Sequence, residues 1–393
     1  MANQANASVR PGIVAIPKSP STVSVSVIDT TSHLFGIPAG MLVAPTIPGL
    51  DYLAAPCYSF LIQHVDAVSG NTRRLIFDLG IRKDVDRLPE FLHQQAKDLN
   101  LRIDVAKSVR EILEDGGVSC AEGEIEAIIW SHWHWDHTGN PAEFPTTTKL
   151  IVGPGFKANL LPGNPADPEK SFLESDYAGR EMQELALPDF DMMIGQFPAH
   201  DYFGDGSFYL LNSPGHAIGH MCGLARVTSN PDSFIFMGGD IAHHAGEWRP
   251  SPFLPMPQQI SPNPFDDSAA SCPSAMFDKL RSSLGLTTPT APFLVPARLE
   301  VGQVHHDVDE TIASIQKLQE FDVADAENVL VVVAHDETFL DQPDFFFPNT
   351  ANEFMKKGLV KRTRWRYLRD FAQAIGWEGE VVGKRNWGPV AAE

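Results

Sequence analysis

The chain has 393 residues, of which 43% are hydrophobic, and it carries 30 Lys and Arg against 50 Asp and Glu, which gives a net charge of −20. A chain of this length can bury a large core in one domain or two. Its acidic balance repels polyphosphates at a distance, which argues against nucleic acid as a partner. The sequence holds no run approaching about 18 apolar residues, so we expect no membrane span.

The cysteine content and the first residues bear on the compartment. Residues 1–22 are mostly polar, contain three prolines and lack the apolar stretch of a secretory signal, so we expect an N-terminal tail. The cysteines are too far apart to indicate a disulfide framework or a paired-cysteine metal site. They are Cys57, Cys120, Cys222 and Cys272. These features predict a cytoplasmic protein, and we expect a monomer or a homodimer.

Predicted strands and helices alternate along the first 160 residues. Residues 23–29 alternate apolar and polar side chains, as a half-buried strand does. Two later segments carry apolar side chains at helical spacing. The predicted strands cover residues 23–29, 58–63, 74–80 and 149–152. The predicted helices cover residues 88–99 and 105–113. This alternation predicts a layered α/β protein.

Six positions directly after a predicted buried strand hold three imidazoles and one carboxylate. The strand is the apolar run 125–130. The ligand-type residues are His132, His134, Asp136 and His137. Histidine is the commonest metal ligand near neutral pH, and a carboxylate added to imidazoles suits zinc and similar divalent metals. Core packing gives no reason to gather these side chains, so the stretch predicts a metal site.

Three later predicted strands each end near a further ligand-type residue. The strands are residues 208–212, 233–237 and 328–333, and the residues that follow them are His216, Asp240 and His335. Because α/β folds build their sites at strand ends, we expect these side chains to join the cluster. His220 is predicted to be a hydrogen-bonding partner and not a ligand. Asp336 either orients its neighbour or caps a turn.

The His-x-His-x-Asp-His motif at residues 132–137 resembles the signature of the metallo-β-lactamase superfamily. The three later residues follow in the order that this superfamily uses, and the resemblance spans residues 23–337. It implies an α/β fold of the αββα type, in which two mixed sheets pack face to face with helices outside. Asp78 matches an Asp-x-Gly of the superfamily, which implies that it accepts hydrogen bonds near the metal loop and fixes ligand orientation.

The resemblance also implies two metal ions, with zinc as the default and iron, manganese or cobalt as alternatives. The first ion would be held by His132, His134 and His216, the second by Asp136, His137 and His335. Asp240 would bridge the two ions, because a carboxylate can ligate two cations with its two oxygens.

Such a pair of ions would ionise a trapped water that attacks a carbonyl carbon, and Asp136 or Asp240 would carry the proton to the leaving group. His134 stands where the oxygen reductases of the superfamily carry Glu, and Asp240 stands where antibiotic-cleaving lactamases carry Cys. The motifs are most similar to those of N-acyl homoserine lactonases and glyoxalase-II-type thioesterases. His243 stands where the lactonases commonly carry Tyr, so we predict that it polarises a carbonyl or protonates a leaving group.

Residues 246–306 are rich in proline with interspersed apolar side chains, and we predict that they form a rigid wall over the substrate pocket. The predicted pocket residues are Trp133, Trp135, His244, Trp248 and Phe253. We place a metallo-β-lactamase-like domain at residues 23–345, with that insertion, and a helical extension at residues 346–393. Residues 356–369 mix basic and aromatic side chains, which predicts an amphipathic helix with one solvated face.

Together these features predict a dinuclear metal-dependent hydrolase that opens a small, partly apolar cyclic ester or amide. A lactone or a γ-lactam is the expected substrate, with detoxification of a xenobiotic as the role. Two alternatives stay open: a thioesterase or phosphodiesterase that uses the same metals, and a non-catalytic metal-binding protein. A substrate carrying glutathione or coenzyme A would need a cationic groove, and the proline-rich segment offers few cations.

Overall fold

The computed structural model describes residues 14–66, 68–324 and 326–389. Residues 1–13, the first part of the predicted tail, lie outside the described residues. The remainder of that tail lies on the molecule: Val14 and Ile16 pack against a hydrophobic core, and the carbonyl of Pro17 accepts a hydrogen bond from the buried Arg226. The polar first segment is therefore anchored from residue 14 onward.

One mixed sheet of seven strands forms the first layer of the described chain. Its strands are β1 (Val23–Phe35), β3 (Ala55–Val65), β4 (Thr72–Phe77), β5 (Arg102–Val105), β6 (Ala127–Ile129), β7 (Lys149–Val152) and β8 (Met182–Glu184). The spatial order is β5-β1-β3-β4-β6-β7-β8. Pairing is antiparallel from β5 to β4 and parallel from β4 to β8.

A second sheet of six strands forms the facing layer. Its strands are β9 (Met192–Ile194), β10 (Phe197–Asp201), β11 (Phe208–Asn212), β12 (Met221–Ser229), β13 (Asp232–Met237) and β17 (Val329–Val332). The order is β17-β13-β12-β11-β10-β9, with only the β13–β17 pair parallel. Two short ladders lie apart from both sheets. They pair β2 (Val43–Ala44) with β16 (Val295–Pro296), and β14 (Gln259–Ile260) with β15 (Cys272–Pro273).

Strand alternation explains why the sheets stack. Successive strand residues point to opposite faces, and in β6 Ile129 joins the cluster between the sheets while Ile128 joins the cluster on the outer face. From the second sheet, Leu210 and Ile235 meet Ile129 in the middle, whereas Leu211 points into the outer core of that sheet. The buried strands thus fill three apolar layers, and the predicted αββα sandwich is confirmed.

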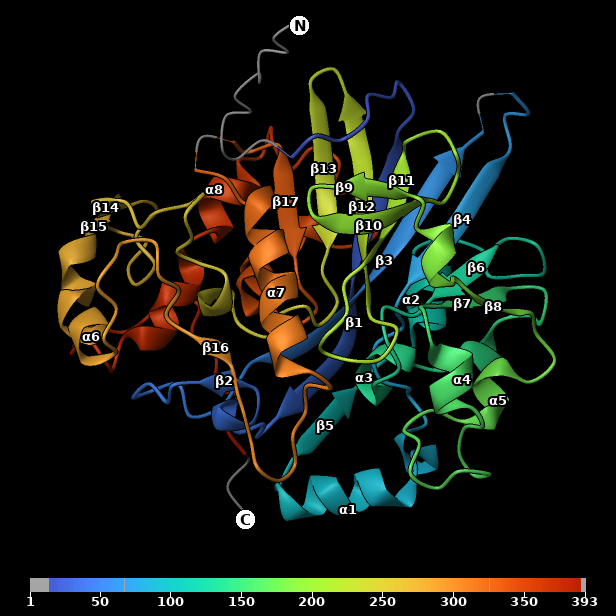
Figure 1. Ribbon diagram of the computed structural model, residues 1–393, viewed down its shortest axis with the longest axis horizontal. Helices are drawn as coiled ribbons and strands as arrows, with labels where there is room; N and C mark the ends of the chain where they lie inside the picture. Colours follow the sequence, from blue (N-terminus) through green and yellow to red (C-terminus); the bar gives the residue numbers. More distant parts are fainter. Residues whose placement is uncertain (1–13, 67, 325, 390–393) are drawn as a thin grey trace, which may run out of the picture.

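Helices lie around the two sheets (Figure 1). They are α1 (Glu90–Asp98), α2 (Val109–Asp115), α3 (Trp135–Thr138), α4 (Phe156–Leu160), α5 (Glu174–Tyr177), α6 (Asp278–Ser283), α7 (Val308–Leu318) and α8 (Leu359–Thr363). Leu113 of α2 and Phe156 of α4 pack on the first sheet, and Ile315 and Leu318 of α7 pack on the second. The αββα layering therefore rests on apolar helix stripes as well as on the sheets.

The prediction of a helix over residues 105–113 is wrong at its start. Val105 ends β5, which pairs with β1, and the helix begins only after Ser108. Ser108 accepts a hydrogen bond from the backbone N–H of Glu111, and the Glu111 side chain accepts one from the N–H of Ser108, a reciprocal cap that fixes the helix start. Within the two sheets, the strands without a counterpart among the predicted strands are β5, β8, β9, β10 and β12, and the four short strands of the separate ladders were not predicted either.

The predicted single helix over residues 356–369 is also wrong. The structure has α8 and then a separate 3-10 helix, η10 (Arg366–Phe371). The predicted solvated face is present in the first part of the segment, where Lys356, Lys357, Lys361 and Arg362 are exposed. Arg369 is instead 0% exposed and forms ion pairs with Glu337, at 2.9 Å, and with Asp341. Because these carboxylates compensate its charge, the second part of the segment packs into the protein.

The segment after residue 345 contributes to both cores of the second sheet. Phe354 and Leu359 belong to the cluster between the sheets, and Leu368 and Phe371 belong to the outer cluster. The boundary at residue 345 stays a prediction, since the segments on either side share one core.

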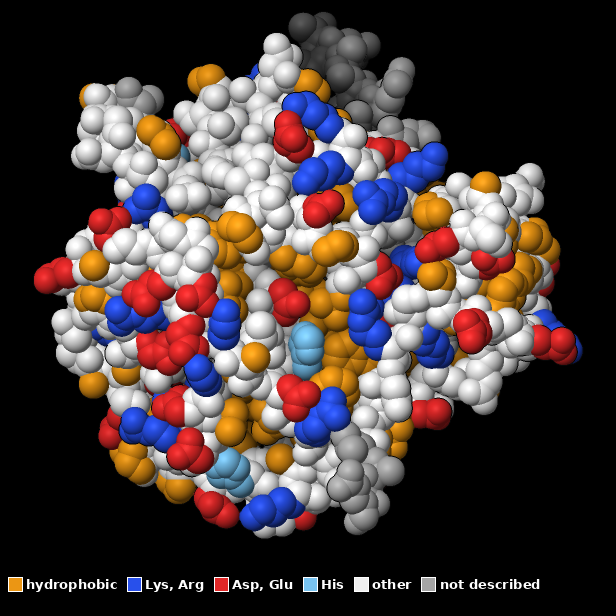
Figure 2. Space-filling model, turned by 180° about the vertical axis from the view of Figure 1, so that it is seen from behind, with side chains coloured by type: hydrophobic (Ala, Val, Ile, Leu, Met, Phe, Trp, Pro, Cys, Tyr) orange, Lys and Arg blue, Asp and Glu red, His pale blue; other side chains and the backbone are white. Residues whose placement is uncertain are grey.

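Charged side chains lie on the surface of the molecule, and the cysteines lie in its interior. Acidic side chains lie among basic ones over much of the face seen in Figure 2. All four cysteines are buried free thiols. Among the described residues, no helix has both the length and the apolar character that a membrane crossing requires.

Substituting Arg369 by Ala should lower the free energy of unfolding by about 3–5 kcal/mol, because it leaves the buried carboxylate of Glu337 without its ion-pair partner, whereas Asp341 keeps Arg366 and Arg385. Arg362 lies exposed on the same segment and is the matched control. Arg362→Ala should change stability by no more than about 0.5 kcal/mol. Denaturant unfolding of both variants measures the difference, and equal midpoints would contradict the role given to Arg369.

Candidate active site

Four loops at the ends of β6, β11, β13 and β17 meet at one end of the sandwich. The β6 loop runs into the short helix α3 and carries the His-x-His-x-Asp-His motif. The other three loops deliver His216, Asp240 and His335. All seven candidate ligands therefore come together, although more than 200 residues separate the first from the last in the sequence.

The first group of donors consists of three histidines and one oxygen of Asp240. His216 Nε2 lies 3.2 Å from His132 Nε2 and 3.0 Å from His134 Nδ1. Asp240 Oδ2 lies 3.5 Å from His216 Nε2 and 3.7 Å from His132 Nε2. These nitrogen and oxygen atoms all lie within 4.8 Å of one another, as the ligands of a single metal ion must.

The second group uses the other oxygen of Asp240. Its Oδ1 lies 3.1 Å from His137 Nε2 and 3.2 Å from His335 Nε2. Asp136 Oδ2 completes the group at 3.8 Å from His137 Nε2 and 3.5 Å from His335 Nε2. The two oxygens of Asp240 therefore face different donor groups, so this one carboxylate belongs to both.

Two buried atoms at the centre test whether the residues fit metal ions. His137 Nε2 and Asp240 Oδ1 are 3.1 Å apart and buried, yet neither has a hydrogen-bond partner within the described chain. Leaving buried polar atoms unpaired costs free energy unless something else satisfies them. Imidazole and carboxylate donors suit zinc and neighbouring divalent metals, so the donor set fits two such ions.

The histidines of the two groups have opposite pKa shifts. Burial lowers the pKa of His132 and of His216 well below the ordinary value, and it lowers the pKa of His134 to about 4. Burial acts the same way on His137 and His335, but nearby carboxylates, Asp240 above all, outweigh it and raise the pKa of both well above the ordinary value. Without metal, the first group is thus neutral while the second group retains protons.

Asp78 holds the metal loop in the manner that the Asp-x-Gly match implied. Its carboxylate accepts hydrogen bonds from the backbone N–H of Ser131 at 2.6 Å, from Ser131 Oγ at 2.7 Å and from His137 Nδ1 at 2.9 Å. With Nδ1 donating to Asp78, the Nε2 lone pair of His137 points to the second donor group. Outer carboxylates commonly fix the tautomer of a ligand histidine in this way.

Other partners hold the remaining loops. His335 Nδ1 lies 2.8 Å from the carbonyl oxygen of Pro56. His220 is a hydrogen-bonding residue, as predicted: its Nε2 accepts from the backbone N–H of Asp240 at 3.1 Å, and its Nδ1 donates to the carbonyl of Ser213 at 2.9 Å. Asp336 caps the turn that follows, by accepting from the N–H of Thr338, and does not orient His335.

His305 is a site residue that the sequence analysis missed. It is buried, with Nδ1 3.2 Å from His216 Nδ1 and Nε2 3.1 Å from the carbonyl oxygen of Leu42. Burial lowers its pKa to about 4. The one signal in the sequence was a His305-His306 pair just before α7, and no motif marked it.

A cleft of about 520 Å³ opens onto the donor groups. Asp136, His216, Asp240, His243 and His335 lie at its polar end. The rest of the lining is mainly apolar and comes from the loop before β2, from α1 and its flanks, and from α3. These residues include Ile37, Met41, Leu42, Phe91, Leu92, Leu99, Leu101, Trp133 and Trp135.

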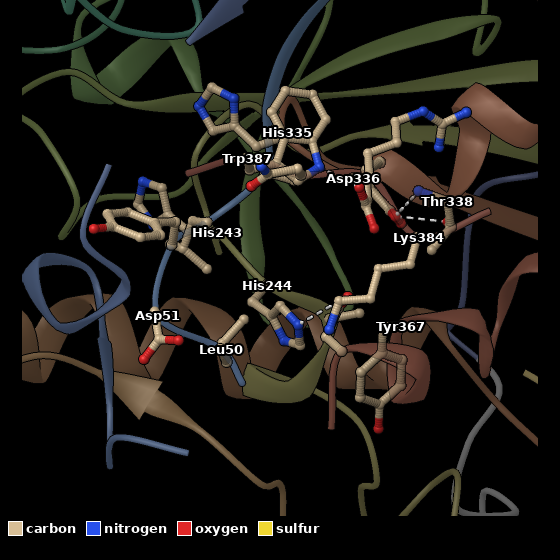
Figure 3. Close-up of a pocket in the computed structure, with 18 of the residues that line it drawn as sticks. Leu50, Asp51, His243, His244, His335, Asp336, Thr338, Tyr367, Lys384 and Trp387 are labelled. Carbon is tan, nitrogen blue, oxygen red and sulfur yellow. Dashed lines mark hydrogen bonds and ion pairs between the residues drawn. The ribbon is translucent and has the colours of Figure 1, made fainter. Parts of the chain in front are cut away.

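The structure brings only part of the predicted pocket to this cleft. Trp133 and Trp135 line it, and His243 Nε2 lies 3.3 Å from Asp240 Oδ2. His244 instead lines a second cavity of about 260 Å³, which shares His243 and His335 with the cleft (Figure 3).

The proline-rich segment 246–306 does not form the wall predicted for it. Trp248 is 1% exposed in the outer core of the second sheet, with the Arg249 guanidinium 5.0 Å from its ring centroid, and Phe253 is not among the cleft residues. From this segment, four residues near its end reach the cleft, namely Gly302, Gln303, Val304 and His306. The aromatic side chains of the segment pack inward because the second sheet and α7 leave an apolar face to cover, and α1 supplies the wall.

Comparisons with known proteins agree with this architecture, although no family model matches the chain. The chain is 44% identical over 364 residues to Gamma-lactamase FDB1 of Fusarium pseudograminearum, covering 92% of this chain and 85% of that protein. It is 37% identical over 367 residues to Metallo-hydrolase mfmC of Annulohypoxylon moriforme, covering 93% and 92%. The solved structure of B. thuringiensis AiiA with N-decanoyl-L-homoserine bound has a TM-score of 0.50 and 16% identity, covering 84% of this chain and 99% of AiiA, and supports the fold.

The two-sheet fold with its His and Asp cluster therefore defines a metal-dependent hydrolase. The chain belongs to the metallo-β-lactamase superfamily, in the family that contains FDB1 and mfmC.

Replacing Asp78 by Asn should weaken metal retention about tenfold to a hundredfold, because His137 loses the carboxylate that fixes its tautomer. Metal content after dialysis against graded chelator concentrations measures this effect. Asp66→Asn, on a surface turn remote from the cluster, is the control and should retain metal like the unmodified protein. Equal retention by the Asp78 and Asp66 variants would show that Asp78 has no such role.

Proposed function

We propose that the protein is a dinuclear metal-dependent hydrolase that opens a small cyclic ester or amide, either a lactone or a γ-lactam. The observation that carries the proposal is the sharing of Asp240 between two donor groups at the polar end of an apolar cleft. The relatives support it, since FDB1 is named a γ-lactamase. Removal of a xenobiotic is the role that we propose for this activity.

Seven side chains would hold the ions, with Asp240 between them. The first ion would take His132, His134 and His216, and the second would take Asp136, His137 and His335. When bound, the two ions would supply Lewis acidity for the carbonyl and lower the pKa of a trapped water.

The size and lining of the cleft favour a small neutral substrate. Its volume of about 520 Å³ falls in the range of small-molecule pockets. Its described lining contains the carboxylates Asp136, Glu169 and Asp240 but neither Lys nor Arg. A phosphodiester, or a thioester carrying an anionic carrier group, would lack a cationic partner there. The apolar wall from α1 and the two tryptophans suits the uncharged ring of a lactone or lactam.

His243 and Asp136 are the residues that we assign to proton transfer. His243 Nε2 lies beside Asp240 Oδ2, at the boundary between the donor groups and the cleft. From there it can donate a hydrogen bond to a carbonyl oxygen or a proton to the departing oxygen or nitrogen. Asp136, whose side chain is 13% exposed, is the most accessible carboxylate of the cluster and can accept the proton released by the attacking water. Asp240 is the alternative carrier, and its burial between histidines makes bridging its main role.

A substrate panel tests the function directly. Lactones and γ-lactams should be hydrolysed, whereas thioesters and bis-p-nitrophenyl phosphate should turn over poorly. Asp240→Ala should lower the metal content toward one ion per chain and reduce kcat/KM by roughly three orders of magnitude, since several kcal/mol of stabilisation are lost. Turnover of the phosphodiester alone, or two ions retained in the Asp240 variant, would refute the proposal. A protein that binds metal but hydrolyses no member of the panel would be a binding protein.

Acidification should release the second ion before the first. The pKa of His137 and of His335 is raised, so protons compete with metal at these residues already near neutral pH, whereas the lowered pKa of His134, about 4, keeps the first group available. Metal content should therefore fall from two ions toward one as the pH is lowered from neutral, while the first group keeps its ion until the pH approaches about 4.

Metal analysis after equilibration at each pH measures this release. His335→Ala is the control, because a chain that has already lost the second site should hold one ion throughout this pH range. Simultaneous loss of both ions from the unmodified protein would contradict the assignment.

A further inference from the structure

His305 lies behind the candidate ligand His216, on the side away from the donor groups. It is 1% exposed, and its ring meets that of His216 edge to face, with centroids 5.3 Å apart. Both of its nitrogens have a partner: Nδ1 lies 3.2 Å from His216 Nδ1, and Nε2 lies 3.1 Å from the carbonyl oxygen of Leu42. The imidazole therefore links a backbone carbonyl to a candidate metal ligand.

The hydrogen positions in the run of hydrogen bonds from Leu42 through His305 to His216 can be assigned from donor and acceptor chemistry. A carbonyl oxygen only accepts, so Nε2 of His305 carries a hydrogen. A neutral imidazole has one N–H, which leaves a lone pair on Nδ1 of His305. The contact between the two Nδ1 atoms needs one hydrogen, and His216 must supply it. The lone pair of His216 is then on Nε2, the atom that faces His132 and His134.

The Leu42 carbonyl, which accepts the hydrogen bond from His305, is itself held in place. Leu42 O also accepts a hydrogen bond from the backbone N–H of Ala297 at 2.9 Å, next to the short ladder between β2 and β16. A carbonyl has two lone pairs and can serve both donors. This ladder joins the proline-rich segment to the loop before β2, and His305 follows at the end of the same segment.

The other Nε2 ligands use the same device with oxygen acceptors. Nδ1 of His137 faces Asp78, Nδ1 of His335 faces the carbonyl of Pro56, and Nδ1 of His132 faces Ser131 Oγ at 3.1 Å. Among these ligands, His216 is the one whose Nδ1 partner is another imidazole. A nitrogen of a neutral imidazole can accept a hydrogen bond only if the other nitrogen carries the hydrogen. In His305 the Leu42 carbonyl keeps that hydrogen on Nε2.

We propose that His305 is a positioning residue for His216. The hydrogen bond to the Leu42 carbonyl fixes the tautomer of His305, and His305 in turn holds His216 with its Nε2 lone pair directed at the first metal site. This inference rests on the proposed function in one respect, namely that His216 binds metal. It gives the proline-rich segment a role other than the predicted pocket wall, because the segment fixes a ligand from behind.

Two kinds of substitution separate a positioning role from simple packing. Gln at residue 305 keeps one acceptor and one donor at the end of its side chain, so His305→Gln can bond both His216 and Leu42. Phe fills a similar volume and can bond neither. His305→Leu is a second apolar variant, so a folding defect confined to the larger ring leaves the test intact. His306→Ala removes the adjacent, exposed imidazole and is the control for metal retention.

The measurement is zinc content per chain across a graded series of chelator concentrations, with circular dichroism to establish folding. His305→Phe and His305→Leu should weaken the first site about tenfold to a hundredfold. His305→Gln should restore most of that affinity, and His306→Ala should match the unmodified protein. His216→Ala should lose one ion outright.

The outcomes test the role of His305 separately from the proposed dinuclear metal site. Folded apolar variants that hold zinc like the unmodified protein, or a Gln variant as weak as the Phe variant, would overturn the role of His305. A third ion in the unmodified protein, lost in every His305 variant, would also overturn it, because His305 would then be a ligand. Unmodified protein that binds no zinc at all would instead refute the dinuclear site.

Discussion

The site is organised around one buried carboxylate surrounded by imidazoles. The side chain of Asp240 is 3% exposed, and its oxygens lie 3.1–3.7 Å from nitrogens of five histidines. Burial alone would raise the pKa of Asp240, but His137, His335 and His243 hold its pKa well below the ordinary value. A buried anion needs compensating positive charge. The raised pKa of His137 and of His335 favours protons on the second group in the metal-free protein, and bound divalent cations would replace those protons.

Four of the candidate ligands are held from outside by partners that other parts of the chain supply. Asp78 comes from the end of β4, the Pro56 carbonyl from β3, and His305 from the segment before α7. His220 holds Asp240 through its backbone N–H. Both sheets and the proline-rich segment thus contribute to one geometry, so the packing of the sandwich and the orientation of the imidazoles depend on each other.

The cleft combines this charged centre with an apolar wall. In the proposed reaction, low-dielectric surroundings would strengthen the interaction between fixed dipoles and a polarised carbonyl. The wall comes largely from α1 and the loop before β2, whereas the aromatic residues of segment 246–306 are committed to the outer core. The donor groups and the apolar wall of the cleft therefore come largely from different segments of the chain.

From the sequence, the pattern of strands and helices indicated a layered α/β protein, and the resemblance of the motif to the metallo-β-lactamase superfamily supplied the αββα arrangement and the set of side chains that meet at the site. The candidate ligands lie shortly after strands whose apolar pattern is local, and strand ends in such folds gather at one edge. Only the tertiary structure shows the role of His305, the wall that α1 adds to the cleft and the burial of Arg369. A lone histidine, an amphipathic helix and a basic stretch look the same along the chain whether they face solvent or a neighbour. Their roles depend on partners, Leu42, the cleft and Glu337, that the fold brings close from distant positions.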